Sequence, residues 1–165
     1  MRKIILLFAV LGLLSCNVTT YYIVRHAEKE TSNTMTSDVP LSTAGKERAV
    51  ELKNRLRNEN IRYIFSTNYN RTISTAEPTR QFFNTTITLY NTADTMDEFI
   101  RHLRKITDGN VLIIGHSNTV DDIVNRLSGE NYIKRDLSDS EYGDLFIVKK
   151  RGSHYSFKKD HFGNN

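Results

Sequence analysis

The chain has 165 residues, of which 38% are hydrophobic and 25% charged, and it contains only 8 Gly and 2 Pro. This length supports one domain, and the composition is globular, which excludes collagenous, mucin-like and strongly disordered classes. A single Cys excludes an internal disulfide framework, a four-cysteine zinc site and a CxxC redox pair. The formal net charge of +4 is too small to indicate nucleic-acid binding by itself.

The N-terminal segment has the pattern of a secretory signal. Arg2 and Lys3 precede an apolar run over residues 4–14, and Ser15 supplies a small side chain before Cys16. Eleven residues of helix at about 1.5 Å each reach roughly 16 Å, about half of the ~30 Å hydrocarbon core, so a permanent membrane span is not expected. Without Arg2 and Lys3, 21 basic and 19 acidic residues remain, a net charge near +2.

The residues around the cysteine favour a lipid anchor. Leu13-Leu14-Ser15-Cys16 resembles the lipobox of bacterial lipoproteins, which implies cleavage before Cys16 and lipid on that residue. We therefore predict a signal peptide over 1–15, a lipid-anchor linker over 16–20 and one domain over 21–165. The expected location is the bacterial cell envelope, anchored to a membrane; the alternative is a secreted or periplasmic soluble protein.

Strand and helix patterns alternate along the domain. The β-prone runs cover residues 21–24, 61–65, 86–90 and 111–114, and a hairpin around Gly152 is expected from 144–150 and 155–158. Four helices are predicted. The first covers residues 42–58, and the second begins near residue 71. The third begins at a capping box of Thr95 and Glu98, and the fourth covers 120–127 and ends before Gly129. This alternation predicts an α/β fold, a three-layer α/β/α sandwich with a mostly parallel central sheet.

Two predicted strands end in histidine, at Arg25-His26 and at Gly115-His116, and the loop after the strand at 61–65 leads to Arg71. Ligands of such sheets bind beyond the carboxyl ends of the strands, so these side chains are expected to meet at one edge. Two imidazoles and two guanidiniums would repel one another unless an anion belongs between them. A phosphoryl group fits, because arginine offers it planar, paired donors and a neutral imidazole can attack phosphorus.

Four short motifs, in order, resemble those of the histidine phosphatase superfamily, also called the phosphoglycerate mutase-like family. They are Arg25-His26-Ala27, Leu41-Ser42-x-x-Gly45, the Ser66–Arg71 loop with Thr75-Ala76 behind it, and Gly115-His116-Ser117-Asn118-Thr119. The resemblance covers about residues 21–129 and implies a phosphoglycerate mutase-like sandwich.

The resemblance also implies roles for individual residues. His26 would be the nucleophile that becomes phosphohistidine, while Arg25, Arg71 and His116 would bind the phosphoryl oxygens. Lys29 and Asn118 either contact the phosphate or are ordinary polar residues of a loop and a helix start. The family needs no metal or other cofactor, and two histidines beside arginines, without converging carboxylates or thiols, make a poor cation site.

The general acid for the leaving group is the gap in the pattern. Ser117 stands where the acid-phosphatase branch has an aspartate, so that branch does not fit. Asp94 and Glu28 are the named candidates, and another acid or no dedicated acid stays open. Without one, substrates with good leaving groups would be favoured, namely acyl phosphates, phosphoramidates or pyrophosphates.

The sequence therefore predicts a metal-independent phosphatase acting through phosphohistidine, and the short domain favours hydrolysis over a mutase reaction. The alternative is a catalytically weak domain that binds or senses phosphorylated ligands. The expected partners are a phosphorylated small molecule, in preference to a phosphoprotein, and a membrane through Cys16, with no nucleic acid; the oligomeric state stays open. A basic cluster, Lys149-Lys150-Arg151 with Lys158-Lys159, is either a solvated hairpin or a contact with anionic headgroups.

Overall fold

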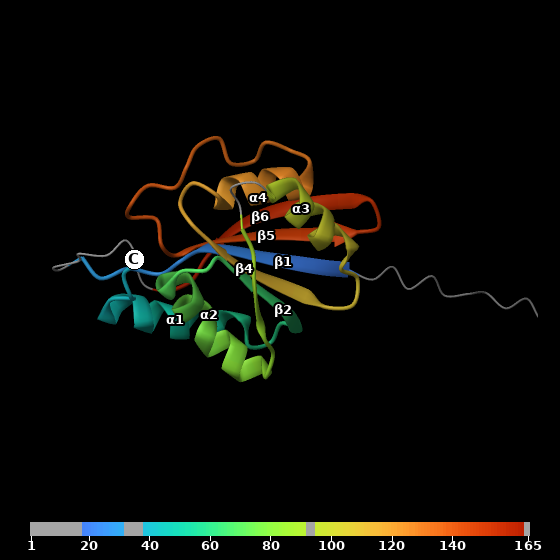
Figure 1. The fold of residues 1–165 in the computed structure, drawn as a ribbon. Helices are drawn as coiled ribbons and strands as arrows, with labels where there is room; N and C mark the ends of the chain where they lie inside the picture. Colours follow the sequence, from blue (N-terminus) through green and yellow to red (C-terminus); the bar gives the residue numbers. More distant parts are fainter. Residues whose placement is uncertain (1–17, 32–37, 92–94, 164–165) are drawn as a thin grey trace, which may run out of the picture.

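A computed structural model describes residues 18–31, 38–91 and 95–163, which form one sheet between two layers of helices (Figure 1). The strands are β1 Val18–Arg25, β2 Ile61–Ser66, β3 Ile87–Leu89, β4 Asn110–Gly115, β5 Asp144–Arg151 and β6 His154–His161. The helices are α1 Thr43–Leu56, α2 Asn70–Phe83, α3 Met96–Lys105 and α4 Val120–Ser128.

The strand order across the sheet is β3-β2-β4-β1-β5-β6. The first four of these strands are mutually parallel, while β5 runs antiparallel to β1 and β6 antiparallel to β5. The two histidine-terminated strands are neighbours, and their last residues, Arg25 and Gly115, are paired in register. The sheet therefore brings the two predicted catalytic motifs to the same edge.

Each face of the sheet is covered by a pair of helices, α1 with α2 on one side and α3 with α4 on the other (Figure 1). Alternate residues of β1 divide between the faces: Tyr22 and Val24 pack against Leu52 and Leu56 of α1, whereas Tyr21 and Ile23 join the cluster of α3 and α4. The three-layer, mostly parallel α/β/α sandwich predicted from the sequence is confirmed.

Two local predictions are corrected. Strand β1 begins at Val18, so residues 18–20, assigned above to a linker, lie in the sheet, where Val18 pairs with Arg151. The capping box of Thr95 and Glu98 does not form: the Thr95 side chain caps no helical N–H, and its hydroxyl donates to the Asn91 carbonyl at 2.8 Å. In the part of the chain that the structure describes, no helix is long and apolar enough to cross a bilayer.

The motif Leu41-Ser42-x-x-Gly45 holds α1 against the segment that follows β1. Ser42 caps α1 by accepting from the Gly45 N–H at 3.1 Å, and its own N–H donates to the Glu28 carbonyl at 2.9 Å. A Cβ at position 45 would lie 2.1 Å from the Glu28 carbonyl oxygen, a backbone atom. Glycine is therefore required here by the close approach of two backbones.

Gly45→Ala is expected to lower the free energy of unfolding by about 1–3 kcal/mol, because overpacking against backbone outweighs the gain of about 1 kcal/mol in helix propensity. Urea unfolding of the variant and of Glu47→Ala, a change at an exposed position of α1, checks this. An unchanged or higher midpoint for Gly45→Ala would contradict the close approach.

Candidate active site

The site lies at the carboxyl edge of the parallel strands, where His26 and His116 come together. The His26 N–H donates to the Gly115 carbonyl at 3.0 Å, which extends the β1–β4 pairing by one residue. The two imidazole centroids are 5.5 Å apart, with their planes inclined at 66°. A single phosphoryl group can therefore reach both rings.

One nitrogen of His26 is committed to a hydrogen bond with backbone. Its Nδ1 lies 2.8 Å from the Ala27 carbonyl oxygen, which can only accept, so Nδ1 carries the proton. The neutral ring consequently has its lone pair on Nε2. This is the tautomer that a histidine nucleophile requires.

Burial and nearby cations keep both imidazoles neutral. Burial, with smaller contributions from Arg25, Arg71 and His116, lowers the pKa of His26 to about 3. Burial, with Arg71 and Arg25, lowers the pKa of His116 to about 4. The cluster as it stands therefore carries its positive charge on the arginines.

The stability of the protein should fall as the pH falls from about 6.5 towards 4. In that window an unfolded histidine, with its ordinary pKa of about 6.5, binds a proton that the folded His26 and His116 reject, so protonation favours unfolding. Each histidine contributes a slope of up to about 1.4 kcal/mol per pH unit. Urea unfolding in phosphate-free buffers measures the free energy of unfolding at each pH. His26→Gln should reduce the dependence of this free energy on pH, whereas His154→Gln, at an exposed position, should leave it unchanged.

A chain of hydroxyl groups orients His116. The Thr72 hydroxyl donates to the Thr67 and Tyr69 carbonyls, each at 2.9 Å, and accepts from the Thr67 hydroxyl at 3.1 Å. The Thr67 hydroxyl proton is therefore donated to Thr72. The Thr67 hydroxyl oxygen lies 2.8 Å from His116 Nε2 and consequently accepts a hydrogen bond from the Nε2–H. The loop after β2 therefore fixes the ring of the histidine that follows β4.

Arg25 is held by the segment between α4 and β5. It is almost fully buried, its Nη1 donates to the Ser138 carbonyl at 2.7 Å, and its guanidinium stacks 4.2 Å above the Tyr142 ring. The Tyr142 ring is also 6.1 Å from that of His26. Arg25 Nε is buried and has no hydrogen-bond partner among the described residues.

Arg71 enters the site from the first turn of α2. Its guanidinium lies 4.4 Å from the Tyr69 ring, which in turn meets the His116 ring edge-on at 5.1 Å. Thr75, one turn further on, accepts from the Ala27 N–H at 2.9 Å and donates to the Arg71 carbonyl at 2.7 Å. The Thr-Ala motif thus ties the start of α2 to the residue that follows His26.

These side chains surround a cavity of about 790 Å³. Both predicted histidines and both predicted arginines line the cavity. Lys29 and Asn118, which the sequence left as either phosphate contacts or ordinary polar residues, also line it. Its other described lining residues are Thr67, Asn68, Tyr69, Tyr90, Asn91, Ser117, Thr119 and Asp139. The predicted nucleophile His26 and the five positions considered for phosphate binding therefore share one cavity.

The two acid candidates are not placed in this cavity by the described structure. Glu28 is absent from the described lining, and its Oε1 accepts from Arg48 Nε and Nη2, each at 2.7 Å. Asp94 and Cys16 lie outside the described residues. The one carboxylate of the described lining is Asp139, which is fully exposed and lies 3.5 Å from Arg25. No group of three or more His, Cys, Asp or Glu suited to a metal ion occurs within 18–31, 38–91 and 95–163.

Sequence reasoning did not select Tyr142, Ser138 or Thr67. Tyr142 and Ser138 belong to an irregular segment without periodicity, and Ser138 acts through its backbone carbonyl, so no side-chain pattern marks them. Thr67 was included in the Ser66–Arg71 motif, but its contact with His116 spans 49 positions. Only the neighbouring positions of β2 and β4 in the sheet make that contact possible.

The α/β sandwich has the phosphoglycerate mutase-like fold. The model of the histidine phosphatase superfamily (branch 1) matches residues 21–93, which confirms the resemblance of this chain to that superfamily. Members of the superfamily are phosphatases or mutases, which supports an enzymatic activity. No curated protein matches the sequence significantly.

Solved structures share the fold at low sequence identity. The protein histidine phosphatase SixA, solved with tungstate, has a TM-score of 0.67 and 19% identity, over 86% of this chain and 96% of that one. Phosphoserine phosphatase from Entamoeba histolytica, in complex with 3-phosphoglyceric acid, has a TM-score of 0.65 and 12% identity, over 89% and 98%. Phosphoglycerate mutase from Bacillus anthracis has a TM-score of 0.62 and 15% identity, over 88% and 93%.

Proposed function

We propose that this protein is a metal-independent phosphatase that hydrolyses a phosphorylated substrate through a phosphohistidine at His26. The observation that carries the proposal is the pairing of a neutral His26, with its lone pair on Nε2, and His116 at 5.5 Å in a cavity lined by two arginines. The family match at residues 21–93 supports the same chemistry.

The first step transfers the phosphoryl group to His26. Nε2 attacks phosphorus and forms a P–N bond while the bond from phosphorus to the leaving oxygen, or to the leaving nitrogen of a phosphoramidate, breaks. The leaving atom keeps the electron pair and takes a proton from water. Arg25 and Arg71 bind the equatorial oxygens, whose charge is spread in the transition state. The Nδ1–H bond to the Ala27 carbonyl stabilises the positive charge that the ring acquires. Water then attacks phosphorus, breaks the P–N bond and restores His26 with release of phosphate.

His116 would assist as a donor. In the structure its Nε2–H is bonded to Thr67, so donation to a phosphoryl oxygen requires either a second proton on the ring or exchange of Thr67 for that oxygen. A bound dianion favours the protonated ring, because it opposes the effect of the two arginines on the pKa of His116.

The proposed substrate class depends on the general acid, and among the described residues none lies shielded in the cavity. Glu28 is paired with Arg48 and Asp139 is in open solvent, so the described cavity offers no shielded carboxylic acid for an alkoxide leaving group. We therefore infer a preference for acyl phosphates, phosphoramidates or pyrophosphates on a small molecule. The likeness to a protein histidine phosphatase supports the phosphoramidate class and keeps a phosphoprotein as the second choice.

The rival function is a domain that binds or senses phosphorylated ligands with little turnover. The lack of a shielded acid among the described residues of the cavity also favours this rival function. The chain from Asn17 onwards, assayed with chelator present, should release phosphate from acetyl phosphate faster than from p-nitrophenyl phosphate. Binding of vanadate without turnover of either compound would instead establish the binding domain.

We further propose that Cys16 carries the lipid that anchors the protein to a membrane of the bacterial envelope. The motif Leu13-Leu14-Ser15-Cys16 supports this proposal. Cys16→Ser should appear in the soluble fraction or keep its signal peptide, as seen by fractionation and mass spectrometry. Normal processing and membrane retention of that variant would reject the anchor.

A further inference from the structure

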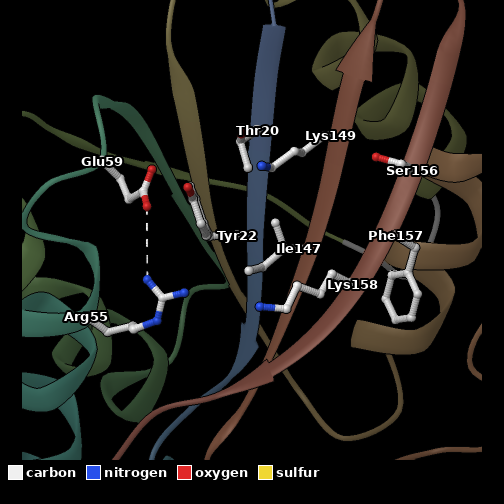
Figure 2. A pocket seen from close by; sticks show the side chains of 9 residues that line it. All are labelled: Thr20, Tyr22, Arg55, Glu59, Ile147, Lys149, Ser156, Phe157 and Lys158. Carbon is white, nitrogen blue, oxygen red and sulfur yellow. Dashed lines mark ion pairs between the residues drawn. The ribbon is translucent and has the colours of Figure 1, made fainter.

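The sheet has a second lined hollow at the edge opposite the histidines. It encloses about 350 Å³ between the C-terminal end of α1 and strands β1, β5 and β6. Figure 2 shows the ammonium groups of Lys149 and Lys158 directed towards β1, on the side from which Arg55 extends. The hydroxyl groups of Thr20, Tyr22 and Ser156 and the carboxylate of Glu59 complete the polar lining, which therefore holds three cations and one anion.

Strand register divides the five Lys and Arg residues of the hairpin between the two faces of the sheet. Lys150 and Lys159 lie on one face, and the other three lie on the opposite face. Lys149 is paired with Ser156, Arg151 with His154, and Ile147 with Lys158, so these side chains share the face that carries Ile147 into the α1 cluster. We name the set Lys149, Arg151, His154, Ser156 and Lys158 the hairpin surface; all five side chains are exposed.

The charge of the hairpin surface is only partly compensated. Asp160 pairs with Lys158 at 3.0 Å and with Arg55 at 2.9 Å, and Glu59 lies 4.0 Å from Arg55. Lys149 and Arg151 have no carboxylate within ion-pair distance among the described residues. The surface as a whole is therefore cationic, although the chain after Cys16 is nearly neutral.

The hairpin surface also lies beside the start of the domain. Val18 is paired with Arg151, and paired Cα atoms of antiparallel strands are about 5 Å apart. Two residues of chain, from Cys16 to Val18, reach at most about 7 Å in any conformation. A lipid on Cys16 would therefore hold the hairpin surface within reach of the headgroups.

We propose that the hairpin surface docks on a membrane containing anionic phospholipids, with a headgroup phosphate in the hollow lined by Arg55, Lys149 and Lys158. Cationic side chains near such a surface are attracted by its negative potential. Strand β1 spans eight residues, roughly 25 Å at ~3.3 Å each, and so separates the Val18 end beside the hairpin surface from the catalytic edge at Arg25.

The test measures binding to vesicles without the lipid anchor. The chain from Asn17 onwards contains every described helix and strand and both main core clusters, so it retains the whole described fold. It should sediment with phosphatidylglycerol–phosphatidylcholine vesicles, less as salt is raised, and not with pure phosphatidylcholine. The triple variant Lys149→Gln, Arg151→Gln, Lys158→Gln should bind on the order of 100-fold more weakly, at about fivefold per cation.

A matched variant separates local from overall charge. Lys46→Gln, Arg101→Gln and Lys134→Gln remove three exposed cations elsewhere and should leave vesicle binding within about twofold of the parent. Circular dichroism and thermal melting show whether each variant is folded, independently of any phosphatase activity. The proposal would be overturned by any of three results. These are an equal loss of vesicle binding in both triple variants, no binding of the folded parent to anionic vesicles, and binding to an oligonucleotide but not to vesicles.

Discussion

Replacing His26 by alanine is expected to reduce phosphate release by on the order of 10⁴-fold or more and to remove the phosphoenzyme entirely. The variant loses the only atom proposed to form a covalent bond with phosphorus, and the remaining arginines can bind the substrate but cannot accept the phosphoryl group. The measurement is steady-state hydrolysis of acetyl phosphate, together with rapid quenching of a radiolabelled phosphoryl donor. Phosphohistidine is identified by its lability in acid and stability in alkali.

His154→Ala is the matched control, because that histidine is exposed on β6, far along the sheet from the cavity. It should keep both the parent rate and the phosphoenzyme. A label that persists in His26→Ala, or a rate close to that of the parent, would remove His26 from the mechanism even if the protein remained a phosphatase.

Arg71→Ala is expected to lower kcat/KM by about 10²–10³-fold, the usual cost of losing one donor aimed at charge that develops in the transition state. The guanidinium stands over Tyr69 beside the cavity, so its removal takes away paired donors without emptying a packed core. Arg71→Lys should recover only part of the loss, because an ammonium supplies charge without the planar fork. Vanadate binding should weaken in the same order as the rates.

Arg80→Ala tests whether any loss of charge on α2 has this effect. Arg80 lies on the same helix, but its guanidinium pairs with Glu77 at 2.7 Å and does not line the cavity. Its removal should change kcat/KM little. If Arg71→Ala and Arg80→Ala have equal effects, Arg71 does not bind the phosphoryl group.

Several features of the fold and of the site could be predicted because they depend on residues close together in the sequence. Apolar runs of strand length that stop at Arg25-His26 and at Gly115-His116 identify two buried strands with polar ends, and parallel α/β sheets place such ends at one edge. Ser42 before α1 and Gly129 after α4 also act as expected: Ser42 caps its helix, and Gly129 adopts a φ of 80°. In each case the cause lies within a few residues of its effect.

The capping box at Thr95 shows why a local pattern can fail. Its sequence satisfies the rule for a helix start, yet the Thr95 hydroxyl bonds to the preceding Asn91 carbonyl instead. The sequence determines which hydrogen bonds a side chain can form, whereas the tertiary structure decides which of them it does form.

The sequence by itself determined the fold class, the four motifs and the residue types of a phosphoryl site. Only the tertiary structure decided that His26 and His116 lie 5.5 Å apart, that Thr67 orients His116, and that Ser138 and Tyr142 hold Arg25. The same holds for the pairing of Val18 with Arg151. The physical reason is that these contacts join segments 49 to 133 positions apart, and their formation depends on strand order and packing, which no local propensity encodes.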